Sequence, residues 1–269
     1  MKLNEIYALL DAPAPRALSD EYCAKYGAYD NSGVLIDTGA DIGKILFSLD
    51  LSAAAVREAE KAGANLIVTH HPAIYSRIGN IRVGDPLGAK LAACLRNGIS
   101  VVSMHLNLDA AAGGIDDCLM QGVRGATGAA GTAKPAVMQP LSGEGCGYGR
   151  AYGVRELPLS AFAEAVKTGL GARRVEVYGR AERKICRAAS FCGAGAGEDS
   201  LEFALREGAD VVVSSDFKHH ILTLASETGL AVVQLTHYAS ENYGFEKYYR
   251  KIRGQAGVPC VFHTDEELL

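Results

Sequence analysis

Short apolar runs alternate with longer amphipathic stretches along most of the chain. The run LIVT, Leu66–Thr69, follows AAAVREAEKAG, a stretch with helical periodicity that Ser52 can cap and Gly63 can end. The order recurs when DPLGAKLAACLRNG leads into ISVVSMH, and when GEDSLEFALREG leads into ADVVVSS. Helix, glycine and apolar strand in repetition are typical of α/β proteins. We therefore predict mixed, largely parallel sheets flanked by helices.

Two parts of this pattern resemble each other. The segment AEKAGANLIVTHH (Ala59–His71) is similar to ALREGADVVVSSDFKHH (Ala204–His220), because each passes through A-x-x-x-G-A and an apolar run to a His-His pair. Further on, NGISVVSMH is similar to TGLAVVQLTH. The similarity predicts two related α/β halves, although α/β units also resemble one another without duplication.

The halves are expected to meet in a connecting segment. Residues 125–140, GATGAAGTAKPAVMQP, are rich in Gly, Ala and Pro, which suits a connection. We place the N-terminal half at 1–125 and the C-terminal half at 126–269, with a metal cleft between them.

The predicted strands end in residues that commonly bind metal ions. Ligand sites of open α/β sheets lie beyond the carboxyl ends of the strands, so these side chains are expected to face a cleft. Three strand ends carry such residues: His70 with His71, His105 with Asp109, and His237 with Glu241.

The spacing of these residues favours two ions. His237 and Glu241 are four positions apart, which places both on one face of a helix. Neighbours in an extended chain point to opposite sides, and Pro72 favours extended geometry at His71. His70 and His71 would then each bind one of two ions roughly 3.5–4 Å apart.

Each feature also has a structural interpretation. A histidine at a strand end can be a hydrogen-bonded structural residue, and an i,i+4 His/Glu pair can be a solvated helix face. Asp109, before a Gly-Gly pair, can cap a turn. The glycine-rich turn Phe191–Ser200 can bind an anion at a helix start or be a tight connection, and His219-His220 can face the cleft or be structural.

Composition excludes several classes of function. The chain is 48% hydrophobic and 22% charged with a net charge of −4, and no Lys/Arg run exceeds two residues, which argues against nucleic-acid and anionic-membrane partners. No apolar run approaches the roughly 18 residues of a membrane helix, and the start does not resemble a signal peptide. Seven scattered cysteines without a CxxC pair indicate reduced thiols and a cytoplasmic protein.

Four ordered segments resemble the Nif-three-like family, whose members are often named GTP cyclohydrolase I type-two homologues. They are VTHHPAIYS, HLNLDAAAGGIDDCL, SSDFKHH and HYASENYG, and YDNSGVLID resembles an early strand of that family. The resemblance covers nearly the whole chain. It implies a dinuclear metal centre between two α/β halves and a ring-shaped hexamer. The metal residues implied by the matching segments are His70, His71, Asp109, His237 and Glu241.

The resemblance also assigns roles to individual residues. It implies that Glu241 bridges the two ions and that His105 orients Asp109. The chain departs from the family where Leu106 stands in place of a frequent Thr and Thr236 in place of a frequent Gly, and SSD replaces a Thr-Gly-Glu-like stretch. The departures remove no expected ligand, and they leave the substrate open.

Two functions are consistent with these observations. The first is a metal-dependent hydrolase of the GTP cyclohydrolase I type-two kind, which would open a cyclic amide or phosphoester of a small anionic substrate using two zinc, iron, manganese or nickel ions. The expected catalytic acid/base groups are His105, His219 and His220. The alternative is a non-catalytic metal-binding, scaffold or regulatory protein.

Overall fold

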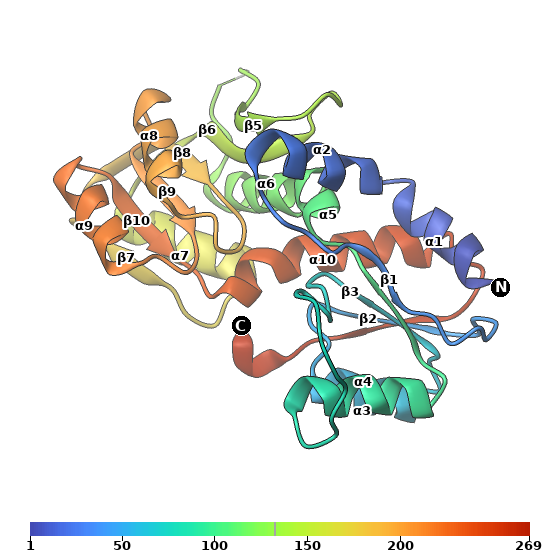
Figure 1. Ribbon diagram of the computed structural model, residues 1–269. Helices are drawn as coiled ribbons and strands as arrows, with labels where there is room; N and C mark the ends of the chain where they lie inside the picture. The colour runs from blue at the N-terminus through green and yellow to red at the C-terminus, as the bar shows by residue number, and fades with distance from the viewer. Residues whose placement is uncertain (132) are drawn as a thin grey trace. The chain divides into compact units, whose positions relative to one another are not determined.

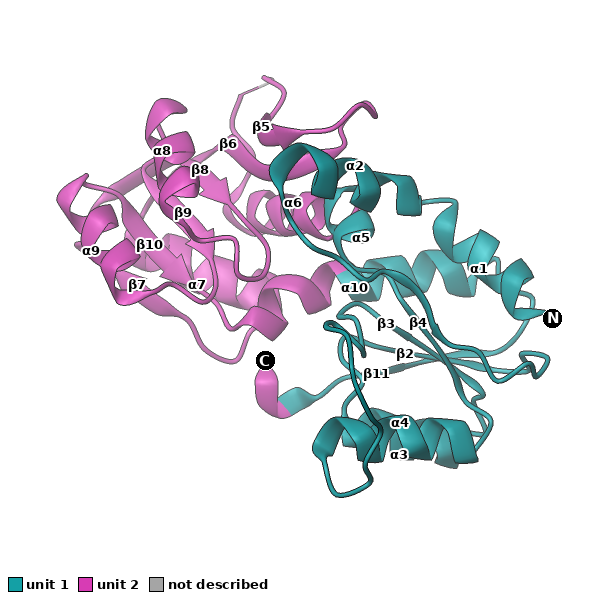
Figure 2. Ribbon diagram, viewed as in Figure 1, with its two compact units in different colours: residues 1–111, 245–266 teal, residues 112–244, 267–269 magenta. Residues whose placement is uncertain are grey.

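The chain folds into two compact units, each with its own sheet. The computed structural model describes residues 1–131 and 133–269. The units are coloured separately in Figure 2 and comprise, for unit 1, Met1–Ala111 with Phe245–Glu266 and, for unit 2, Ala112–Gly244 with Glu267–Leu269. Both sheets are mixed and flanked by helices, so the predicted fold class is confirmed.

Unit 1 contains a five-stranded sheet in the order β1-β4-β3-β2-β11. Only β1 is antiparallel to its neighbour, and the other three pairings are parallel. The elements are α1 (Leu3–Asp11), α2 (Arg16–Tyr26), β1 (Gly33–Ile36), β2 (Ile45–Ser48), α3 (Ala53–Ala62), β3 (Leu66–Thr69), α4 (Pro86–Arg96), β4 (Ser100–Ser103), α5 (Leu106–Ala110) and β11 (Cys260–His263).

Helices cover both faces of this sheet (Figure 1). On one face, α3 and α4 pack Val56 and Leu91 against Leu46 and Ile67 of the strands. On the other, Phe47 of β2 lies 6.1 Å, centroid to centroid, from Phe245 of α10 (His237–Arg253), a helix that begins in unit 2 and ends in unit 1. Each fully buried side chain of this size contributes roughly 1.5–3 kcal/mol.

The ends of α3 agree with the sequence prediction. The hydroxyl of Ser52 accepts a hydrogen bond from the N–H of Ala55, and the helix ends at Gly63, whose φ of 66° is left-handed. These two residues therefore fix where β3 begins, and through it the position of the His-His pair.

Unit 2 contains a six-stranded sheet in the order β5-β6-β8-β9-β10-β7. The pairings β8–β9 and β9–β10 are parallel, while the other three are antiparallel. The elements are α6 (Ile115–Thr127), β5 (Ala136–Pro140), β6 (Gly147–Pro158), α7 (Leu159–Gly169), β7 (Glu176–Tyr178), β8 (Lys184–Ser190), α8 (Glu198–Arg206), β9 (Val211–Ser214), α9 (His219–Glu227) and β10 (Ala231–Gln234). A short 3-10 helix, Glu266–Leu268, ends the chain.

Both units contain the same order of elements where the sequence repeats. Unit 1 runs α3-β3-α4-β4 and unit 2 runs α8-β9-α9-β10, and in each case the two strands are parallel neighbours. The division into related halves, 1–125 and 126–269, stays a prediction. Its expected connection, 125–140, contains the end of α6 and all of β5, and Thr132 lies outside the described residues.

None of the helices described is long and apolar enough to cross a membrane.

Candidate functional site

The carboxyl ends of three parallel strands lie level in unit 1. Ser48 of β2 pairs with Thr69 of β3, which pairs with Ser103 of β4. The hydroxyls of Thr69 and Ser103 lie 2.6 Å apart and tie two of these ends together. Residues that follow the three strands therefore gather at one edge of the sheet, and they are Asp50, His70, His71 and His105.

His70 is held in one tautomer. Its Nδ1 atom lies 2.7 Å from the carbonyl oxygen of Met104. Because a carbonyl only accepts, Nδ1 carries the proton and Nε2 carries the lone pair that a metal ion needs. That Nε2 atom lies 3.5 Å from Oδ1 of Asp109, and both side chains are buried. The buried imidazole therefore directs the nitrogen that carries the lone pair to a carboxylate.

His71 and His105 show the same arrangement with carboxylates as acceptors. Nδ1 of His71 lies 2.8 Å from Oδ1 of Asp50, and Nδ1 of His105 lies 2.8 Å from Oδ1 of Asp30. Metal-binding histidines usually donate the second ring N–H to a carboxylate or a carbonyl, which fixes the ring and makes the ligating nitrogen more basic. Both rings are thus oriented as metal ligands are.

Asp30 is built to remain ionised. Burial raises the pKa of this carboxyl, but hydrogen bonds from His105, Ser19 and Ser32 together hold its pKa well below the usual range. Ser32 also accepts a hydrogen bond from the backbone N–H of His105 at 3.0 Å. The segment that contains Asp30 and Ser32 therefore fixes both the ring and the backbone of His105.

The three imidazoles form one cluster. The ring centroid of His70 lies 4.8 Å from that of His71 and 5.1 Å from that of His105. One ligand atom from each of the three residues lies within 4.8 Å of the others, close enough to hold a metal ion. His105, expected to orient Asp109, thereby joins the metal-binding candidates.

The prediction that neighbouring imidazoles point to opposite sides is wrong. It assumed an extended chain, but β3 ends at Thr69 and the chain turns there. The N–H groups of His70 and His71 both donate to the carbonyl of Leu49, at 3.1 and 3.0 Å. The chain is therefore not extended at the pair, and the two ring centroids lie only 4.8 Å apart.

In unit 2, residues that could bind a metal ion again follow the ends of strands. His237 is the first residue of α10, and its Nε2 atom lies 3.2 Å from Oε2 of Glu241, so the predicted i,i+4 pair is present. Nδ1 of His237 lies 2.5 Å from Oδ2 of Asp216, which follows β9. Asp216 has a φ of 54°, a left-handed conformation that Asp tolerates better than most residues. This backbone turn directs the Asp216 carboxylate to the imidazole.

Gly193 lies against this pair. Its N–H donates to Oγ of Ser240 at 3.0 Å, and its carbonyl accepts from Oγ of Ser215 at 2.5 Å. A Cβ atom on residue 193 would overlap Oε1 of Glu241 and lie 3.2 Å from Nε2 of His237. The glycine-rich turn, a predicted anion site or tight connection, thus lets the backbone approach a carboxylate.

A buried ion pair holds the start of that turn. The carboxylate of Asp116 accepts hydrogen bonds from the N–H groups of Cys192 and Gly149 at 3.2 and 2.9 Å, and Nη1 of Arg150 lies 3.3 Å away. Asp116 and Arg150 are almost completely buried. Their interaction fixes the residue immediately before Gly193.

Two predicted catalytic residues lie apart from these contacts. His219 and His220 are exposed at the start of α9, and within the described part of the chain neither makes a side-chain hydrogen bond or ion pair with His237 or Glu241. Their catalytic role stays a prediction.

The sequence reasoning missed the three carboxylates that orient imidazoles, Asp30, Asp50 and Asp216. The sequence positions of two of them, shortly after the ends of strands, could have identified them. Asp50 follows the end of β2 by two residues, and Asp216 follows the end of β9 by two residues. A search for carboxylates at every strand end would have found both.

The candidate ligand atoms of the two units suit a divalent metal ion. They are imidazole nitrogens and carboxylate oxygens without a thiolate, a set that suits zinc, iron, manganese or nickel. Unit 1 offers the imidazole cluster and Asp109, and unit 2 offers His237 with Glu241.

Proteins of known structure share this fold. A Bacillus cereus protein related to NIF3 matches with a TM-score of 0.80 at 22% identity, covering 99% of this chain and 97% of that chain. Reduced HcgD from Methanocaldococcus jannaschii matches with a TM-score of 0.78 at 26% identity, covering 97% of each chain.

Sequence relatives also match most of the chain. A Clostridium perfringens protein named GTP cyclohydrolase 1 type 2 homolog is 29% identical over 99% of this chain and 97% of its own. NGG1-interacting factor 3 of Saccharomyces cerevisiae is 30% identical over 84% of each. The model of the family described as Duf34/NIF3 (NGG1p interacting factor 3) matches residues 1–267. The chain therefore belongs to the Duf34/NIF3 family.

Proposed function

We propose that the protein binds two divalent metal ions and acts as a metal-dependent hydrolase. The proposed ligands are His70, His71 and Asp109 from unit 1 and His237 and Glu241 from unit 2. Zinc, iron, manganese or nickel would suit this mixture of nitrogen and oxygen donors.

One observation carries the proposal. His70, His71, His105 and His237 each bind an oxygen acceptor through Nδ1. Such a bond leaves the lone pair on Nε2, the nitrogen that an imidazole ligand offers to a metal ion. The same arrangement recurs in four histidines at three strand ends, β3, β4 and β10, and this recurrence supports metal binding.

Glu241 suits the bridging role because its carboxylate offers two oxygens. The side chain is buried, its Oε2 lies 3.2 Å from Nε2 of His237, and its Oε1 lies against Gly193. A carboxylate held from both sides offers oxygens in fixed directions.

The proposed reaction is hydrolysis of a cyclic amide or phosphoester in a small anionic substrate. Divalent ions supply Lewis acidity and lower the pKa of bound water. The carboxylates of Asp30, Asp50 and Asp216 keep three imidazoles in the required tautomer. His105, His219 and His220 remain the proposed proton carriers. Relatives named GTP cyclohydrolase 1 type 2 homolog make cyclic amidine and amide rings the first substrates to test.

The contacts of the histidines also support a second function, metal binding without catalysis. His105 is tied to Asp30, while His219 and His220 contact neither His237 nor Glu241 within the described residues. Proton transfer therefore has less geometric support than metal binding, and a metal-binding or scaffold role is the alternative.

Elemental analysis of the purified, metal-loaded protein tests the common part of both functions, and two ions per chain are expected. Trace metal alone would contradict the proposal. A screen against GTP, cyclic amides and phosphoesters then separates the two functions. Activity that is lost on chelation and restored by metal supports the hydrolase. Full activity of metal-free protein would exclude these residues as its centre.

Assembly and location are proposals of the same kind. We expect a homo-oligomer, with a hexamer as the specific proposal, and light scattering that finds a 28 kDa monomer at micromolar concentration would contradict it.

A cytoplasmic location is supported by seven free cysteines, and labelling of their thiols in cells tests it.

A further inference from the structure

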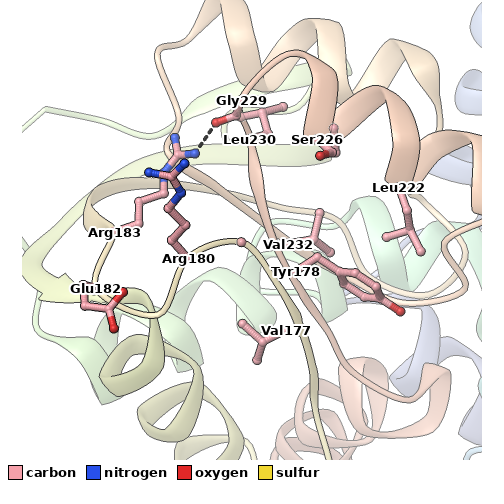
Figure 3. Close-up of a pocket in the computed structure, with 12 residues that line it drawn as sticks. Val177, Tyr178, Arg180, Glu182, Arg183, Leu222, Ser226, Gly229, Leu230 and Val232 are labelled. Carbon is pink, nitrogen blue, oxygen red and sulfur yellow. Dashed lines mark hydrogen bonds between the residues drawn. The ribbon is translucent and has the colours of Figure 1, made fainter.

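Unit 2 contains a cavity that shares no residue with the proposed metal ligands. Its volume is about 1150 Å³, and Figure 3 shows its lining. The walls are the edge strand β7, the neighbouring strand β10, helix α9 and the turn that follows β7. Its lining includes Tyr178, Arg180, Glu182, Arg183, Leu222 and Val232.

The floor of the cavity is apolar and partly aromatic. Tyr178 of β7 pairs across the sheet with Val232 of β10, so both side chains lie on one face. Leu222 of α9 lies over the same face in Figure 3. Tyr178 remains 39% exposed because β7 is the last strand of the sheet. An exposed tyrosine in a cavity offers a ring face for an apolar or planar group.

A tight turn directs two arginines to one end of the cavity. The N–H of Arg183 donates to the carbonyl of Arg180 at 3.0 Å, so the two residues are the first and last of the turn. The start of α7 anchors it, since the N–H groups of Leu159 and Ser160 donate to the carbonyls of Arg183 and Ala181 at 2.8 and 3.1 Å. The backbone positions from which the two arginine side chains extend are therefore fixed.

The two guanidinium groups differ in what they already bind. Arg183 donates through Nη1 to the carbonyl of Gly229, which fixes its plane (Figure 3). Arg180 makes no hydrogen bond or ion pair through its side chain in residues 1–131 and 133–269, and Arg183 makes no ion pair there. The carboxylate of Glu182 points away from both in Figure 3.

This charge arrangement favours an anion. Two cationic groups directed to one end of a cavity repel each other, and an anion between them removes that repulsion. A guanidinium presents a planar fork of N–H donors that matches the two oxygens of a carboxylate or phosphate. One fixed and one uncommitted guanidinium can bind the oxyanion together.

We propose that this cavity binds a small organic oxyanion, a phosphate or carboxylate joined to a planar or branched apolar group. The oxyanion lies between Arg180 and Arg183, and the apolar group lies on Tyr178 and Leu222. The site is separate from the proposed metal centre and does not depend on it.

Ligand-observed NMR titration of the full-length, metal-loaded protein tests the proposal with four probes. Phenyl phosphate and phenylacetate contain both an oxyanion and a ring, whereas inorganic phosphate contains only the oxyanion and phenol only the ring. The two complete probes are expected to bind more tightly than either part, and the tighter of them identifies the preferred oxyanion.

Variants locate the binding. Arg180→Gln is expected to weaken binding of the complete probe by about 10-fold or more, because it removes a charge-assisted hydrogen bond. The control Arg174→Gln, a change at an exposed arginine of the same segment outside the cavity, should leave it unchanged. The metal content of both variants should equal that of the unmodified protein.

Three results would overturn the proposal. One is equal binding by Arg180→Gln and Arg174→Gln. Another is loss of binding in Glu241→Ala but not in Arg180→Gln, which would place the probe at the metal centre. The third combines two findings: the unmodified protein binds no probe, and light scattering shows that Arg180→Gln forms a smaller assembly. Together they would identify the cavity as a contact between copies of the chain.

Discussion

The backbone of Gly193 packs against the carboxylate of Glu241 so closely that a side chain on residue 193 would overlap it. Gly193 also has a left-handed φ of 55°. The glycine therefore satisfies a steric and a conformational requirement at once, and two variants can separate these requirements.

We predict that Gly193→Ala lowers metal content sharply. The methyl group would displace Glu241 and crowd Nε2 of His237. The left-handed backbone alone would cost about 1–2 kcal/mol of stability. The control is Gly208→Ala, because Gly208 has a φ of 69° but a Cβ atom added there would have no neighbour within 4 Å. Elemental analysis and urea unfolding measure both effects, and equal metal content in the two variants would refute the steric argument.

The carboxylate that orients His237 provides a second test. Asp216→Asn keeps a residue that tolerates a left-handed φ but replaces the charged acceptor of the Nδ1 proton with a neutral amide. Metal affinity should fall about 10- to 100-fold, as is usual when such a partner is altered. Competition with a chromogenic chelator measures it. The control is Asp199→Asn, at an exposed carboxylate of α8, and a matching loss there would show a general charge effect.

The elements that deliver these residues could be predicted from the sequence because they depend on local patterns. The LIVT and VVVS runs are buried strands, and Ser52 and Gly63 bound the helix before the first of them. The i,i+4 pair of His237 and Glu241 follows from helix geometry alone.

The partners of the imidazoles depend on contacts between distant segments. Asp30 is 75 positions from His105, and their 2.8 Å contact results from the placement of the segment before β1 beside the end of β4. The rings of His70 and His71 lie close together where both backbone N–H groups donate to the carbonyl of Leu49, a residue that follows another strand. Neither can be derived from residues adjacent in sequence.

Metal stoichiometry tests the proposed bridge. Glu241→Ala should lose both ions, since a bridging carboxylate binds each ion and offsets their mutual repulsion. His71→Ala should lose one, because an imidazole nitrogen binds a single ion. Elemental analysis of both variants, loaded under identical conditions, gives the ratio. Loss of one ion in each would leave Glu241 as an ordinary ligand.

The buried ion pair of Asp116 and Arg150 should control the stability of the protein. Asp116→Ala leaves the Arg150 guanidinium buried without one of its two carboxylates and removes the acceptor of two backbone N–H groups. Removing one member of a buried pair typically costs about 3–5 kcal/mol, which urea unfolding measures. Glu144→Ala is the control, because its ion pair with Lys134 is almost fully exposed and should contribute nothing measurable. If the two variants unfold at the same urea concentration, the network around Asp116 does not stabilise the turn that carries Gly193.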